Sequence, residues 1–166
     1  ADIALYAAKR AGGSRYHFFQ AAMADANRRR AALELSLREA VQRQELRLVS
    51  QHQITSHTRC LSGFEALLRW QHSEFGDVPP TEFIGIAERS GLMPAIGSWV
   101  LAQACEEAQR WPDDLRISVN VSATQLTAPG FVESVRSACG PLPAQRVELE
   151  ITESALMDDA DKAVAV

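Results

Sequence analysis

Apolar and polar side chains alternate along several short stretches in the middle of the chain, and this alternation predicts β-strands. The predicted strands cover 46–54, 60–70, 117–122 and 147–152. Apolar residues at helical spacing predict helices over 80–90, 93–111 and 131–139. A polar turn at 55–58 joins the first two strands, which predicts an antiparallel pair. The later alternation of strands and helices is typical of an α/β fold with parallel strands.

The two ends of the chain show other patterns. A short helix is predicted over 3–9 and a short strand over 15–19, separated by a glycine pair. The segment 21–44 is long, charged and amphipathic, which predicts a connector helix. A last helix is predicted to start near Asp158. We therefore expect the chain to begin inside one folded unit and to end inside another.

Three of the predicted strands carry a hard oxygen donor on one face, namely Glu65, Asn120 and Glu150. The opposite faces are apolar and consist of Phe64, Ala66 and Leu68, of Ile117, Val119 and Val121, and of Val147, Leu149 and Ile151. If helices cover both faces of a parallel sheet, an unpaired carboxylate there costs several kcal/mol. A bound cation would remove that cost, so the pattern predicts a divalent-metal site. The pattern alone also allows a half-exposed sheet whose polar face contacts water.

Composition narrows the class of protein but names no partner. The chain has 166 residues, 46% of them hydrophobic, which is enough for one globular domain with a sizeable core. Its net charge of -4 gives no general attraction to nucleic acid polymers or anionic membranes, and the basic run Arg28 to Arg30 is predicted to be a solvated helix face.

The three cysteines, Cys60, Cys105 and Cys139, are widely spaced, and we expect them to be buried small hydrophobes with reduced thiols. No apolar run reaches the length of a membrane span, and the first residues lack the order of a signal peptide. The expected location is the cytoplasm, and any tether to the inner membrane would have to come from upstream segments outside this chain.

Four stretches together carry a resemblance to a known family: GFEALLRWQH, PTEFIGIAERSGLMPAIGSWVL, ISVNVSATQL and VELEITES. In nearly every element from about Leu33 to Leu156 the chain resembles the EAL-domain family of cyclic di-GMP phosphodiesterases. The leading ADIALYAAKRAGGSRYHFF resembles the carboxyl end of a GGDEF domain, the diguanylate cyclase module. The resemblance implies a GGDEF remnant over 1–20, a connector helix over 21–44 and the N-terminal portion of an EAL domain over 45–166.

The family resemblance also implies a fold and an activity. The fold would be a TIM-like (β/α)8 barrel with an antiparallel first strand, incomplete in this chain. The activity would be hydrolysis of cyclic di-GMP to linear pGpG, supported by Mg²⁺ or Mn²⁺ and inhibited by Ca²⁺. The implied partners are cyclic di-GMP, a second copy in a homodimer formed through the EAL domain, and the upstream GGDEF domain in cis.

Residue by residue, the resemblance assigns Glu65, Asn120 and Glu150 as metal ligands in the catalytic site. Carboxylate and amide oxygens suit Mg²⁺, and a metal-bound water with a lowered pKa would act as the nucleophile.

The substrate contacts implied by the resemblance are Gln51, Leu67 and Arg69. Arg69 would face phosphate, although by itself such a residue is more often a surface or salt-bridge arginine. Glu153 matches a glutamate that holds a loop at the active site and the dimer face, and its position also fits an ordinary helix-cap acid.

Two departures from the family pattern bear on activity. The family's YQP run reads Ser50-Gln51-His52 here, so only the glutamine is kept. The family's later Asp-Asp pair, lysine, glutamate and glutamine are expected beyond Val166, because Asp158-Asp159 lies at a predicted helix start. We therefore expect this chain alone to be inactive, and its open sheet edges to favour a swapped dimer.

Two alternatives remain open at this stage. The domain could be catalytically silent and act as a cyclic di-GMP receptor or a regulatory interaction module. The upstream cyclase could instead be the active partner that this half regulates.

Overall fold

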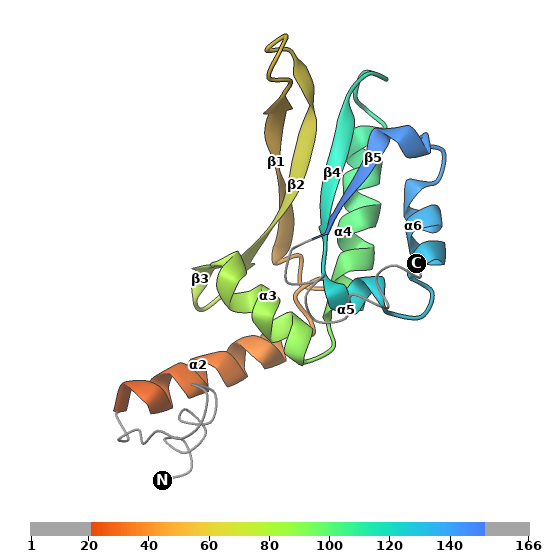
Figure 1. Ribbon diagram of the computed structural model, residues 1–166. Coiled ribbons are helices and arrows are strands. Elements are labelled where there is room, and N and C mark those ends of the chain that lie inside the picture. The colour runs from red at the N-terminus through yellow and green to blue at the C-terminus, as the bar shows by residue number, and fades with distance from the viewer. Residues whose placement is uncertain (1–20, 152–166) are drawn as a thin grey trace, which may run out of the picture.

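A computed structural model describes residues 21–151 as one mixed sheet with helices packed along it (Figure 1). The expectations for 1–20, for Glu153 and for the helix near Asp158 lie outside the described residues. The strands are β1 (Leu46–Ile54), β2 (Leu61–His72), β3 (Gly76–Val78), β4 (Arg116–Val121) and β5 (Val147–Ile151). The helices are α2 (Ala21–Leu37), α3 (Pro80–Arg89), α4 (Met93–Ala108), α5 (Ala123–Leu126), α6 (Phe131–Cys139) and the 3₁₀ turn η1 (Ala144–Arg146).

The sheet has the order β1-β2-β4-β5, and β3 pairs with the end of β2 on the edge opposite β1, because Trp70 is the Cα partner of both Leu46 and Val78. The pair β1-β2 is antiparallel, whereas β2-β4 and β4-β5 are parallel. This confirms the α/β class and the antiparallel first strand. Parallel neighbours need a crossover, and the chain supplies α3 and α4 between β2 and β4, then α5 and α6 before β5.

The core lies between the apolar face of the sheet and α4. Ala66, Ile117 and Val119 have exposed fractions of 5%, 1% and 1%, and they belong to the same buried cluster as Leu101 and Ala104 of α4. Ile117 and Val119 lie on this face because every second side chain of a strand lies on the same face, and Ser118 between them is buried on the other face. Phe64 is half-buried and its ring contacts Trp111, with ring centroids 4.7 Å apart.

The expected burial is wrong for three residues, Ile151, Cys60 and Cys139. Ile151 is exposed at the end of β5, where no further strand is described. Cys60 is exposed because it follows the turn between β1 and β2, while Cys105 is buried as expected and Cys139 is half-buried. Burial, with the neighbouring Cys139 thiol, raises the pKa of Cys105 to about 12, so Cys105 keeps its proton at neutral pH.

The predicted connector helix over 21–44 is too long. Helix α2 ends at Leu37, and residues 38–44 form successive tight turns. Gln44 has a positive φ of 56°, which redirects the backbone into β1. These turns keep Ala40 buried next to Leu33 and Leu37, so the sequence pattern looked like one continuous apolar face.

Helix α2 is fixed to the body of the domain by an arginine from the basic run. Arg29 Nε donates to Glu82 Oε1 at 2.8 Å, and its guanidinium carbon lies 4.9 Å from the centre of the Phe75 ring. Arg29 is therefore half-buried and paired with α3, so the prediction of a solvated face describes it only in part. Arg28 has its partner Asp25 on α2 itself.

Docking of α2 on α3 is expected to weaken in acid. The hydrogen bond from Arg29 holds the pKa of Glu82 below its usual value of 4.5. A lowered folded-state pKa stabilises the folded form above that usual value, and the contribution is lost as the pH falls through the folded-state pKa. The effect is modest because solvent reaches both side chains. Hydrogen exchange of 21–37, corrected for intrinsic rates, should show weaker protection at pH 4 than at pH 7.

The matched variants for this prediction are Arg29→Gln and Arg28→Gln. The first should weaken protection of 21–37 at pH 7 and remove most of the acid-dependent loss, whereas the second should behave like the wild type. Equal behaviour of the two variants would contradict the role of the Arg29–Glu82 pair.

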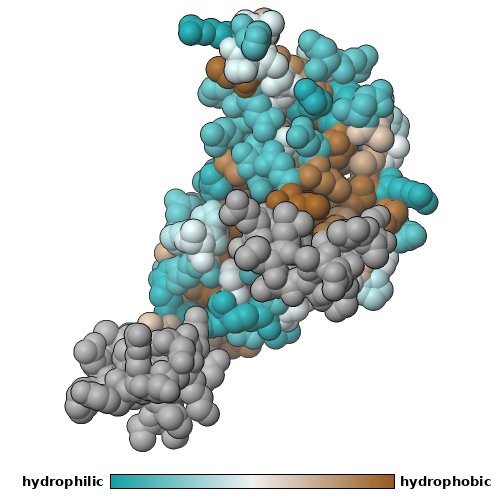
Figure 2. All heavy atoms as spheres, viewed as in Figure 1, coloured by the Kyte–Doolittle hydropathy of each residue, from teal (hydrophilic) through white to brown (hydrophobic). Residues whose placement is uncertain are grey.

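Hydrophilic residues cover the β1-β2 hairpin in the view of Figure 2, and apolar residues gather over the part of the molecule where β4 and β5 lie.

Among residues 21–151 no helix is both long and apolar enough to cross a membrane.

Candidate functional site

The polar faces of four strands come together on the side of the sheet opposite α4. Gln51 is the Cα partner of Glu65, and Glu65 is the partner of Ser118. One step further along the parallel strands, Asn120 is the partner of Glu150. Residues paired in this way lie on the same face, so the register brings together Glu65, Asn120 and Glu150, which were predicted to form one site.

Glu65 and Asn120 are in direct contact although 55 positions separate them. Asn120 Nδ2 donates to Glu65 Oε1 at 2.6 Å. The two side chains come from neighbouring parallel strands, β2 and β4. The contact therefore depends on the parallel pairing of these strands, which the hydrophobic pattern alone could only suggest.

Gln53 is a site residue that sequence reasoning missed. Its Nε2 donates to Glu150 Oε1 at 3.4 Å, and its Oε1 accepts a hydrogen bond from Ser118 Oγ at 3.3 Å. Gln53 thus connects β1 to β4 and β5. Gln53 and Glu150 are 97 positions apart in the sequence. Its spacing in the sequence could have indicated it, because Gln53 lies two residues after Gln51 and therefore on the same face of β1.

A glycine allows β2 and β4 to approach each other closely at this place. A Cβ atom on Gly63 would lie 2.3 Å from the carbonyl oxygen of Arg116, which is closer than real atoms come. Gly63 is the Cα partner of Arg116 at the start of the β2-β4 pairing, and Glu65 follows two residues later. The absent side chain at residue 63 therefore helps to set the spacing of the two strands that carry Glu65 and Asn120.

Arg69 lies on the same face of β2 as Glu65 but about 13 Å further along the strand, at about 3.3 Å per residue. Its Nη1 donates to the carbonyl oxygen of Leu68 at 2.9 Å. It lines a shallow pocket of about 310 Å³ together with Arg47, Trp70, Asp77, Val78, Pro79 and Pro80. The structure thus places Arg69 in a second, cationic area and not within the Glu65 cluster.

Gln51 and Leu67 complete the predicted set within the described residues. Gln51 is exposed, and Leu67 is half-buried opposite Val49. Both share the face of Glu65.

Glu65 lies in the middle of its strand and not at its carboxyl end, because β2 continues to His72 to pair with β3.

The polar face is more open than expected. Asn120 is exposed, and Glu65 and Glu150 are half-buried, because the described helices pack on the other face of the sheet. Of the two interpretations left open by the sequence, the half-exposed sheet describes residues 21–151. Solvent access lowers the cost of keeping both carboxylates ionised.

The donor set fits part of the coordination sphere of a hard cation. Glu65 and Glu150 supply carboxylate oxygens, and rotation of the Asn120 amide would turn Oδ1 to where Nδ2 now lies. Within residues 21–151 no group of three or more His, Cys, Asp or Glu side chains is placed to hold a metal ion. Two carboxylates and one amide leave further positions for water, phosphate or other residues.

Comparison with known proteins places this geometry in a family. The family model described as "EAL domain" matches residues 34–166. An uncharacterized signaling protein of Caulobacter vibrioides is 43% identical over 99% of this chain and 20% of its own length. The bifunctional diguanylate cyclase/cyclic di-GMP phosphodiesterase MucR of Pseudomonas aeruginosa is 38% identical over 100% of this chain and 25% of its own length. The chain thus spans a fifth to a quarter of these relatives.

Solved structures agree with the sequence comparison. The PaMucR phosphodiesterase in complex with c-di-GMP has a TM-score of 0.75 and 39% identity, covering 81% of this chain and 57% of that one. An EAL enzyme in its cAMP- and cyclic di-GMP-bound form has a TM-score of 0.73 and 29% identity, covering 95% of this chain and 43% of that one. The chain therefore belongs to the EAL-domain family, and its sheet is part of the α/β barrel of that fold.

Proposed function

We propose that this chain contributes to a domain that hydrolyses cyclic di-GMP to linear pGpG in the intact protein. The observation that carries the proposal is the contact of Asn120 with Glu65, with Glu150 paired to Asn120 on the next strand. This places two carboxylates and an amide on one face, where a hard cation and a phosphodiester could meet. Support comes from the relative MucR, which is named as a cyclic di-GMP phosphodiesterase.

In this proposal Glu65, Asn120 and Glu150 would hold Mg²⁺ or Mn²⁺. When bound, such an ion supplies Lewis-acid stabilisation of phosphate charge and lowers the pKa of a bound water. Gln53 would keep the Glu150 carboxylate oriented through its amide. Arg69 would present its planar guanidinium to a phosphate, with Gln51 and Leu67 along the same face.

The proposal assigns activity to the intact protein and not to this chain alone. In this proposal the polar face would contribute two carboxylates and one amide, whereas Mg²⁺ takes about six ligands. A general base, if the reaction uses one, would come from residues outside the described part. Residues beyond the described part would have to complete the site.

Metal removal is the experiment that tests this function. The intact protein, treated with EDTA, should lose hydrolysis of cyclic di-GMP, measured as pGpG by liquid chromatography. Mg²⁺ or Mn²⁺ should restore it, and Ca²⁺ should not. Full turnover in the presence of EDTA would contradict a metal-dependent reaction at this site.

A second function, binding without hydrolysis, is favoured by one observation. Arg69 and its pocket lie apart from the Glu65 cluster, so phosphate recognition could persist without turnover. In that case calorimetric titration of the intact protein with cyclic di-GMP would show binding, and no pGpG would form with any of the metals.

A further inference from the structure

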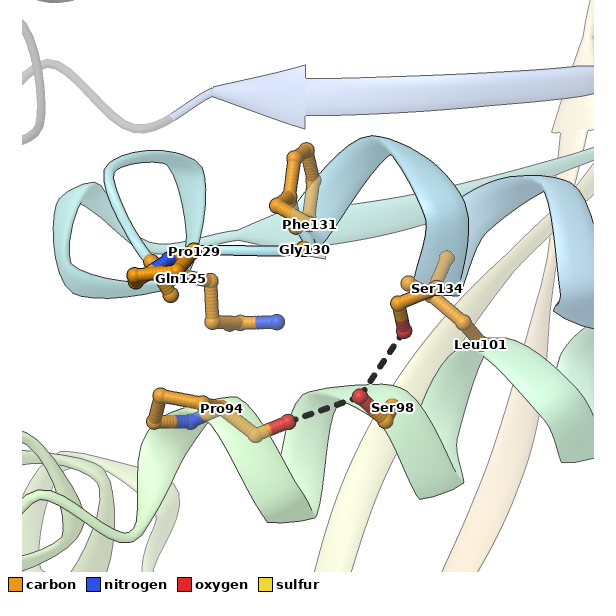
Figure 3. Close-up of a pocket in the computed structure, with 9 residues that line it drawn as sticks. Pro94, Ser98, Leu101, Gln125, Pro129, Gly130, Phe131 and Ser134 are labelled. Carbon is orange, nitrogen blue, oxygen red and sulfur yellow. Dashed lines mark hydrogen bonds between the residues drawn. The ribbon is translucent and has the colours of Figure 1, made fainter.

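Helices α4 and α6 pack against each other and are joined at two places along their contact. Near the start of α6, Ser134 Oγ donates to Ser98 Oγ at 2.9 Å, because the Ser98 proton is used for the carbonyl oxygen of Pro94 (Figure 3). Near the end of α6, the thiol of Cys139 lies close enough to the thiol of Cys105 for a hydrogen bond. Two cysteines from neighbouring helices thus meet in the fold.

The packing of both helices explains why these two thiols meet. On α4, Cys105 lies seven residues after Ser98 and therefore on the same face of the helix. On α6, Cys139 belongs to the side that packs against the buried cluster of which Cys105 is a member. The other residues of that side are Phe131, Val135 and Ala138. The thiol contact is therefore part of the main interface between α4 and α6.

The two thiols differ in their access to solvent. Cys105 is 0% exposed, whereas Cys139 is half-buried. Burial, together with the Cys139 thiol, raises the pKa of Cys105 to about 12, so Cys105 keeps its proton at neutral pH. A small oxidant that enters from solvent therefore reacts first with Cys139, and Cys105 is the second thiol within reach.

Helix α6 is held less firmly than α4. None of the side chains of α6 is fully buried, whereas α4 has buried side chains from its first turn to Ala108. A helix with so little buried surface opens locally more readily than the elements of the core. A covalent bond between the last residue of α6 and α4 would therefore change the local stability of α6 strongly.

We propose that Cys105 and Cys139 form a redox switch in which a hydroperoxide creates a disulfide that fixes the end of α6 to α4. The Cys139 sulfur attacks hydrogen peroxide, the O–O bond breaks, and Cys139 becomes a sulfenic acid while water is released. Cys105 then attacks that sulfur, the S–O bond breaks, and the hydroxide leaves with the Cys105 proton as a second water. Both sulfur atoms are oxidised and the peroxide is reduced. The switch is independent of the proposed hydrolysis.

Oxidation of the intact protein with hydrogen peroxide, followed by alkylation of free thiols and digestion without reductant, tests the proposal. Mass spectrometry should show the peptides of Cys105 and Cys139 joined, with two hydrogens fewer than the separate peptides. Dithiothreitol should separate them again. A Cys139 that is oxidised to sulfinic acid without this link, or that stays reduced, would overturn the proposal.

Three variants assign the role of each thiol. Cys139→Ser, at a half-buried position, should abolish the link. Cys60→Ser removes the exposed thiol after the β1-β2 turn and should leave the link unchanged. In Cys105→Ala the sulfenic acid of Cys139 should persist and be trapped by dimedone. Absence of the dimedone adduct would contradict the order in which the two thiols react.

Hydrogen exchange measures what the link does to the fold. Cys105 and Cys139 are 34 positions apart, and closing a loop of this length restricts the opened state. Exchange of 131–139 should therefore slow by about tenfold or more in the oxidised protein. The same treatment of Cys139→Ser should leave exchange of 131–139 unchanged. Equal exchange in the oxidised and reduced wild type would show that the disulfide does not fix α6 and would overturn the switch.

Discussion

Replacement of Glu65 by glutamine is expected to lower cyclic di-GMP hydrolysis by the intact protein about a thousandfold, which corresponds to roughly 4 kcal/mol of transition-state stabilisation. Glutamine has nearly the same shape and can still accept the hydrogen bond from Asn120 Nδ2. The change removes only the negative charge that a divalent cation needs. The expected loss is therefore in turnover, and the fold of the sheet should be retained.

The measurement is kcat/KM at saturating Mg²⁺, with pGpG quantified by chromatography. Glu106→Gln is a suitable control, because Glu106 is an exposed residue of α4 whose partner Arg110 lies one turn away on the surface. The control should stay within twofold of the wild type. Turnover of Glu65→Gln within tenfold of the wild type would rule out Glu65 as a metal ligand.

Replacement of Trp70 by alanine is expected to give the largest loss of stability, about 3 to 5 kcal/mol. Trp70 is 1% exposed on β2 and packs edge-on against Phe83 of α3, with ring centroids 5.7 Å apart. Its Nε1 also donates to Glu45 Oε2 at 3.0 Å. Burial works against ionisation of Glu45, but this hydrogen bond and the nearby His72 hold the pKa of Glu45 below its usual value. The substitution leaves a cavity and removes a partner from that carboxylate.

Local stability can be followed in the intact protein by hydrogen exchange of peptides that cover β1 and β2. The free energy of local opening should fall for these peptides in Trp70→Ala. Trp99→Ala, at a half-buried position of α4, is the matched control and should cost clearly less. Equal losses in both variants would show that the Trp70 contacts add nothing to the sheet.

The sequence predicts the main strands and their faces because burial of alternate residues leaves a strong signal. The antiparallel β1-β2 pair, the parallel pairing of β4 and β5, and the helices α3, α4 and α6 are confirmed, with α4 ending at Ala108, earlier than the predicted 111. The three-residue strand β3 and the four-residue helix α5 were not predicted, because neither is long enough for a periodic pattern. The end of α2 was missed because Ala40, in the turns after the helix, is buried like Leu33 and Leu37 and so continues the helical apolar pattern.

For the site, the common face of Glu65, Asn120 and Glu150 follows from alternation, and the register confirms it. The roles of these residues as metal ligands stay predictions, as do the substrate contacts of Gln51, Leu67 and Arg69. Gln53 belongs to no motif, and its contacts depend on the closeness of strands far apart in the sequence. Such contacts result from tertiary packing, which a single sequence does not display.

The mixed pairing of the sheet has a consequence for the order in which the domain forms. Contacts of β1 with β2 are local, and an antiparallel hairpin closes within about 1 to 10 μs. The parallel pairings must wait until longer loops have closed, because Glu65 and its partner Ser118 are 53 positions apart, and Asn120 and its partner Glu150 are 30 positions apart. During synthesis the hairpin therefore forms before the ribosome has made β5, and Glu65 becomes a site residue only when β4 docks beside it.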